Sequence, residues 1–155
     1  MPCSDTSQLL EPLNPFDGVR VLAISLLRQQ IADPPQPSPL LGPDLLNYLG
    51  PILFELPPGA IDKPAAQILT TMWPAWLTEC ATMVWFLIER DTNNKTGIAS
   101  PAYLAKLRGY LTVVADKTKK WKAEVEAEPT AASEARLVLD RLEDAVARAR
   151  AAISK

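Results

Sequence analysis

The chain has 155 residues, which is enough for one domain with a hydrophobic core of its own. Its hydrophobic fraction of 48% and charged fraction of 22% lie near the averages of globular proteins, and they argue against wholesale disorder and against a multispanning membrane protein. The net charge of −2 provides no basic field for phosphate groups, so we expect no nucleic-acid partner.

The first 13 residues are polar and interrupted by proline, and they predict a flexible lead-in to a single all-α domain over residues 14–155. Residues 1–11 lack the basic and apolar regions of a secretory signal, so we expect a soluble cytoplasmic protein and leave a nuclear location open. Cys3 and Cys80 have neither the spacing of a zinc site nor that of a disulfide framework.

Two proline-bounded helices are expected in the first third of the chain. The first covers about residues 15–32 and begins at Asn14-Pro15, where a capping residue precedes a proline. Its apolar residues cover more than one face, which is typical of a helix packed between neighbours. The proline-rich connector 33–42 predicts a semi-rigid spacer, with a ligand for an SH3-like groove as the alternative. A second helix follows over residues 43–56, with a kink or two short turns expected at Gly50-Pro51.

The segment 63–90 is predicted to be the central core helix. Its apolar seam repeats in alternating steps of four and three and consists of Leu69, Trp73, Trp76, Cys80, Met83 and Leu87. Pro74 is expected to bend this helix or to split it near Met72. The stretch is long enough to cross a bilayer, but Glu79 would lie near the bilayer centre, so we expect no membrane span.

Two long helices are expected to form an antiparallel hairpin over residues 101–153. The first begins at Ser100-Pro101 and the break at Glu128-Pro129-Thr130 ends it, while the second continues to Ile153. Both have apolar residues at alternating steps of three and four. The polar segment 91–97 before them is expected to be an exposed, mobile connection. The predicted fold class is therefore an all-α helical bundle of about five helices in a single domain.

Histidine is absent from the sequence, which removes the usual general base and the commonest metal ligand. The six glycines form no phosphate-binding loop. We therefore predict no catalytic, cofactor or metal site. Glu79 is the one acid in an apolar setting, and we interpret it, with Thr78 and Thr82, as part of a narrow polar strip that faces water or a partner.

A basic cluster surrounds Trp121 and includes Lys119 and Lys120. Such a cluster could meet an anionic surface, but i,i+4 pairs of Lys120 with Glu124 and of Lys122 with Glu126 predict that it is neutralised within its own helix. The candidate interaction residues are Trp73, Trp76, Glu79, Lys119, Lys120 and Trp121.

These observations favour a non-catalytic interaction or adaptor module, a scaffold component of a larger assembly that binds one or more protein partners. A homo-oligomer stays open, and so does the question whether the last helix belongs to the core or is offered to a partner. Two alternatives are kept: a small carboxylate-dependent enzyme and a membrane-associated helical protein.

Overall fold

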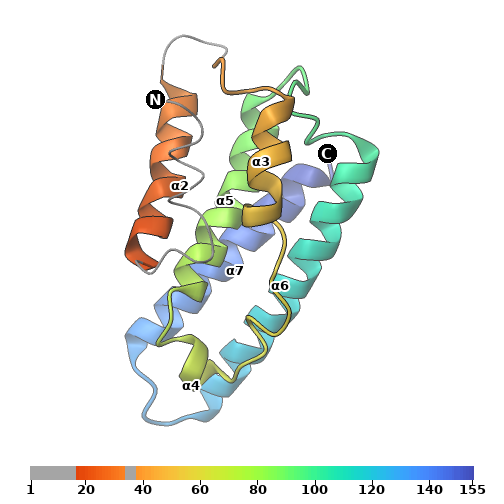
Figure 1. Cartoon of the computed structure of the whole chain (residues 1–155). Helices are drawn as coiled ribbons and strands as arrows, with labels where there is room; N and C mark the ends of the chain where they lie inside the picture. Colours follow the sequence, from red (N-terminus) through yellow and green to blue (C-terminus); the bar gives the residue numbers. More distant parts are fainter. Residues whose placement is uncertain (1–16, 34–37) are drawn as a thin grey trace.

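The computed structural model describes residues 17–33 and 38–155, and this part of the chain consists of six helices with no strand (Figure 1). The helices are α2 (Asp17–Ala32), α3 (Pro43–Leu53), α4 (Ala65–Ile68), α5 (Trp73–Arg90), α6 (Pro101–Ala127) and α7 (Ser133–Ile153). The predicted all-α helical bundle is confirmed. The predictions for the lead-in 1–13, for the helix start at Asn14-Pro15 and for residues 34–37 of the connector lie outside the described residues.

Three long helices form the body of the bundle. Helix α5 packs most extensively against α7, while α6 runs antiparallel to α7 and is joined to it by a short turn at one end of the molecule (Figure 1). Helix α2 packs against α5, and the short α4 packs against α6. The predicted C-terminal hairpin is therefore confirmed, and α7 contributes to the core of this chain.

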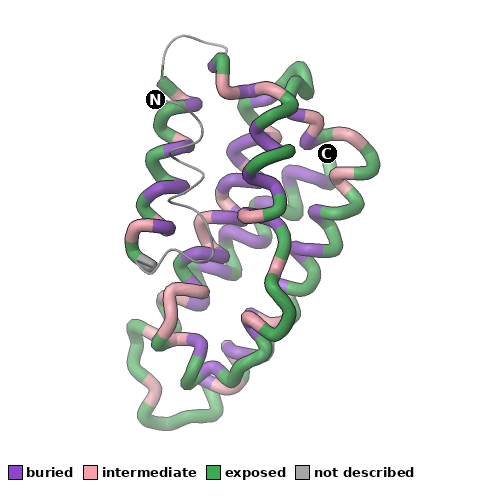
Figure 2. Tube along the Cα trace, viewed as in Figure 1, coloured by how far each residue is buried: buried purple, intermediate pink, exposed green. Residues whose placement is uncertain are grey.

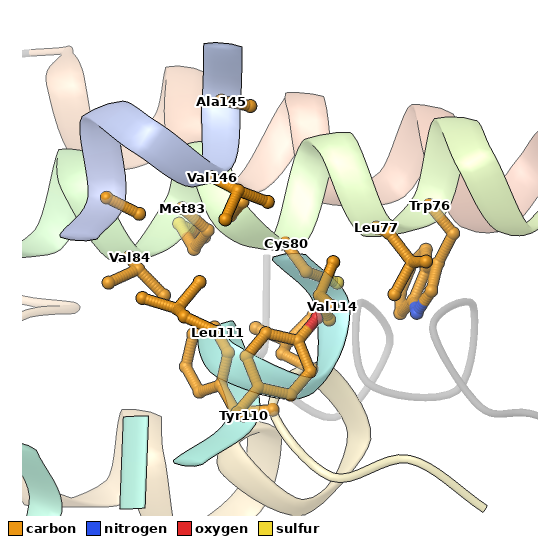
Figure 3. Close-up of a cluster of buried hydrophobic side chains, with 14 of the residues drawn as sticks. Trp76, Leu77, Cys80, Met83, Val84, Tyr110, Leu111, Val114, Ala145 and Val146 are labelled. Atoms are coloured by element: carbon orange, nitrogen blue, oxygen red, sulfur yellow. The ribbon is translucent and has the colours of Figure 1, made fainter. Parts of the chain in front are cut away.

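The core lies where α5, α6 and α7 meet. Figure 3 shows the side chains of these helices interlocking in a cluster that includes Leu77, Cys80, Met83, Tyr110, Leu111, Val114 and Val146. Buried residues mark the helix faces that point inward, and exposed residues mark the opposite faces (Figure 2). Each large aliphatic side chain buried in this way stabilises the fold by about 1.5–3 kcal/mol.

The predicted helix 63–90 is split, and the reason is Pro74. Residues 69–72 form turns between α4 and α5, and Pro74 lies in the first turn of α5, where its missing N–H leaves no helical hydrogen bond unmade. The break explains why the described residues form six helices where about five were expected. It also detaches Leu69 from the seam, which starts at Trp73 in α5; both residues are half-buried.

Polar contacts link α6 and α7 near both ends of the hairpin. Lys122 Nζ lies 3.0 Å from carboxylate oxygens of both Asp140 and Glu143, and hydrogen bonds to these two groups raise the pKa of Lys122. The predicted pair of Lys122 with Glu126 is therefore wrong, because the neighbouring helix offers two carboxylates in a better position. Near the other end of the hairpin, Arg108 Nη2 donates to the carbonyl oxygen of Ile153 at 3.4 Å.

The connection between α5 and α6 differs from the exposed loop that was expected. Asp91 and Thr96 are buried, and the Asp91 carboxylate accepts hydrogen bonds from the backbone N–H groups of Lys95 and Thr96, both at 2.8 Å. The Thr96 hydroxyl adds a third bond at 2.6 Å. Asp91 thus organises the loop internally, although residues 92–95 are exposed as expected.

Candidate functional site

A hollow of about 270 Å³ opens between α2, the segment 51–58 and the start of α5. We call it the tryptophan pocket, and its described lining consists of Arg20, Pro51, Ile52, Glu55, Leu56, Pro57, Pro58, Trp73 and Trp76. Most of these side chains are apolar. The pocket is therefore a mainly apolar hollow with one cationic and one anionic group in its wall.

The two tryptophans reach the pocket because α5 begins where it does. Trp73 is the first residue of α5, and its backbone N–H donates to the Thr71 hydroxyl at 3.2 Å. Trp76 lies three residues further along the helix, so both rings lie on the same side. Trp76 is buried and Trp73 is half-buried, which leaves Trp73 as the ring accessible from solvent.

The opposite wall comes from the end of α3 and the turn that follows it. Gly59 has a φ of +73°, which glycine adopts without the steric penalty of a side chain, and it closes the turn after Pro57 and Pro58. The segment is anchored on α6: Glu55 Oε1 lies 2.5 Å from Lys106 Nζ. This ion pair links the segment that forms the wall to helix α6.

Arg20 is the cationic group of the described pocket lining, and sequence reasoning missed it. Only 4% of the residue is exposed, and its guanidinium lies 4.5 Å from the ring centre of Trp76 and 5.9 Å from that of Trp73. Its Nη1 also donates to Met72 Sδ at 3.7 Å. A desolvated cation over aromatic rings stabilises by about 2 kcal/mol. The sequence signal was a charged residue in a helix that is apolar on several sides.

Glu79 lies outside the pocket lining, in an ion pair with Arg28 that links α5 to α2. The side chains are largely buried, with exposed fractions of 24% and 19%. The neighbouring hydroxyls of Thr78 and Thr82 donate to carbonyl oxygens one turn earlier in α5, both at 2.8 Å. Within the polar strip, Glu79 therefore faces α2. Arg28 was not among the residues singled out from the sequence.

The candidates in α6 lie apart from the pocket. Trp121 is fully buried, and its Nε1 donates to the carbonyl oxygen of Lys63 at 2.9 Å. Lys119 and Lys120 are exposed, and Lys120 Nζ lies 4.0 Å from Glu124 Oε1. The predicted pair of Lys120 with Glu124 is therefore confirmed, although its separation is at the upper limit for an ion pair.

The same stretch of α6 holds the segment before α4. Glu124 Oε2 accepts a hydrogen bond from the backbone N–H of Ala65 at 2.6 Å, and Lys117 Nζ lies 2.6 Å from Asp62 Oδ1. Lys117, Trp121 and Glu124 of this part of α6 therefore have structural partners. Of the six candidates, Trp73 and Trp76 meet in one place, while the others are divided between the α2–α5 contact and the surroundings of α4.

The chemistry available to the described residues depends on metal-ligating side chains and on the buried thiol. Over residues 17–33 and 38–155, no group of three or more Asp, Glu or Cys side chains is placed to hold a metal ion. Burial raises the pKa of the Cys80 thiol far above its usual range, so the thiol is not available as a thiolate nucleophile. None of the six described helices is both long and apolar enough to cross a membrane.

No family model, no curated protein and no solved structure matches this chain. The functional argument therefore rests on the site and its chemistry.

Proposed function

We propose that the chain is a non-catalytic interaction module, and that it binds a protein partner by accepting one apolar side chain of that partner in the tryptophan pocket. The observation that carries this proposal is the pocket itself, which brings Trp73 and Trp76 together against a proline-rich wall. Tryptophan and arginine are the residues most often responsible for binding energy at protein interfaces.

The size of the pocket favours a side chain over a metabolite. Sites for small molecules usually enclose about 300–1,000 Å³, whereas an engineered cavity of about 150 Å³ takes up benzene. The pocket, at about 270 Å³, lies between these values and suits one large side chain. The rest of the partner would then lie across the surface around the pocket mouth.

The carboxylate-dependent alternative requires two acids in one hollow. The described lining of the pocket contains one, Glu55, and that carboxylate is held by Lys106. Glu79 is engaged by Arg28. No contact in the described chain therefore favours this alternative over the interaction module. The expected cytoplasmic location stays part of the proposal, and microscopy of a tagged chain tests it.

Selection from a displayed peptide library tests the proposed function. Peptides that bind the folded chain should share one bulky apolar residue, and their binding should be lost in Trp73→Ala. Trp85→Ala is the matched control, because Trp85 is also a half-buried tryptophan of α5 with an arginine over its ring, Arg148 at 5.2 Å. Recovery only of peptides that bind both variants equally well would show that the pocket is not the binding site.

A further inference from the structure

Helix α2 lies at one edge of the bundle and has one face turned away from it (Figure 1). Among the described helices, its extensive contact is with α5. Ile24, Leu27 and Ile31 belong to the buried face of α2. The opposite face is exposed (Figure 2), and we call it the outer face of α2; it consists of Gly18, Leu22, Ser25, Leu26 and Gln29.

The outer face of α2 exposes two leucines that are one helical turn apart. Leu22 is 58% exposed and Leu26 is 46% exposed. Residues four apart in a helix are neighbours on its surface, so these side chains form one apolar patch. The other large hydrophobic residues that are exposed in the described chain lie on three different helices and are Tyr48, Val113 and Leu137. Helix α2 is therefore the described helix on which two such residues are adjacent.

The outer face of α2 also lacks charged residues. The charged residues between positions 18 and 32 are Arg20, which is buried, and Arg28, which forms the ion pair with Glu79. The exposed positions of α7, by contrast, include Asp140 and Arg141. Depletion of charged residues is typical of the core of a protein interface. The composition of this face therefore suits contact with another protein surface better than contact with water.

A second copy of the same chain fits this face. Around a two-fold axis, a residue near the axis lies opposite its own counterpart or a close neighbour, so a charged group there would face a like charge. An uncharged face avoids that repulsion. Leucine meets leucine in either orientation, because parallel helices place Leu22 against its counterpart and antiparallel helices place Leu22 against Leu26. The net charge of −2 adds little repulsion between two whole chains.

We propose that the outer face of α2 is the interface of a reversible homodimer. A helix of 16 residues is about 24 Å long and about 10 Å wide, so this face covers about 240 Å² in projection, well below the roughly 800 Å² that each partner contributes to a standard interface. The dimer is therefore weak, with a Kd on the order of 100 µM. Arg20 is the α2 residue of the described pocket lining and is buried, so the outer face takes no part in the tryptophan pocket.

Sedimentation velocity of the full chain tests the dimer. Between about 10 µM and 1 mM, the mass should rise from that of one chain towards that of two. Leu26→Glu should raise the Kd at least about tenfold, because the interface would bury a carboxylate beside its own counterpart. Leu137→Glu is the matched control, since Leu137 is a leucine of α7 that is 49% exposed, and it should leave the Kd unchanged.

Two oppositely charged variants test whether α2 contacts α2. One variant carries Leu22→Lys with Leu26→Lys, and the other carries Leu22→Glu with Leu26→Glu. Each alone should stay monomeric, because like charges would face each other across the axis. An equimolar mixture should form a heterodimer that added salt weakens. Circular dichroism of each variant should show the helix content and Tm of the unmodified chain, because both leucines are exposed.

Three results would overturn the proposal: a monomer at every concentration of the unmodified chain, a dimer that Leu26→Glu leaves equally tight, or folded variants of opposite charge that do not associate. The first result requires no variant, so it decides even if a substituted chain fails to fold. The dimer does not depend on the proposed function, since peptides that require Trp73 report on the pocket and sedimentation reports on α2.

Discussion

The contact between Gly50 of α3 and Tyr103 of α6 positions the helix that leads into the proline-rich wall of the pocket. Gly50 is buried, and a Cβ added to it would lie 2.6 Å from the Tyr103 hydroxyl oxygen and 3.7 Å from Cζ. The hydroxyl is buried and has no hydrogen-bond partner among the described residues. The double substitution of Gly50 by Ala and Tyr103 by Phe should therefore be non-additive.

Two opposing effects determine the result for Gly50→Ala. Alanine in a helix interior is more favourable than glycine by about 1 kcal/mol. Forcing an atom into occupied space costs about 1–3 kcal/mol. In the unmodified chain we therefore expect the free energy of unfolding to fall by about 0–2 kcal/mol. In Tyr103→Phe the clashing oxygen is absent and Cζ is at ordinary contact distance, so the same substitution should stabilise by about 1 kcal/mol.

Guanidinium unfolding of the four proteins measures the coupling, which we expect to be about 1–3 kcal/mol. Gly109→Ala is the matched control, because Gly109 lies inside α6 with no side chain or tertiary contact within 4 Å of an added Cβ. It should stabilise the chain by the same amount in both backgrounds. An equal effect of Gly50→Ala in both backgrounds would refute the described docking of α3 on α6.

Three further predictions concern the rest of the bundle. Glu79→Gln should lower the free energy of unfolding by about 1–3 kcal/mol, because Arg28 loses a largely buried partner, and an unchanged value would mean that solvent screens the pair. A chain ending at Glu128 should aggregate on size exclusion, because α5 and α6 lose their cover; a monomeric, helical and equally stable product would instead identify α7 as a partner-binding element. Burial raises the pKa of Tyr103 to about 12, above the value of about 10 in an unfolded chain. The folded state therefore retains this proton longer, so stability from this group is complete below a pH of about 10 and is lost as the pH rises towards 12. Unfolding curves of Tyr103→Phe should show a smaller alkaline loss.

Local periodicity and proline sterics were sufficient to predict the helices. The alternation of three and four residues predicted the inward faces of α6 and α7, and Val114 and Leu139 are fully buried as expected. Pro74 predicted either a bend or a split near Met72, because a proline ring crowds the carbonyl four residues earlier whatever the tertiary context, and the structure has the split. These properties depend on residues close together in the chain, so they can be derived without knowing which helices touch.

The pocket could not be predicted from the sequence, because it is formed by segments that lie far apart in the chain. Trp73 and Trp76 were among the candidates, but nothing in the order of residues indicated that Arg20 would lie over their rings or that residues 51–58 would form the opposite wall. Lys122 shows the same principle, since it pairs with α7 instead of its own helix. A charged side chain pairs with whichever groups packing brings within reach, and helix packing is decided by the burial of whole faces, which local spacing does not specify.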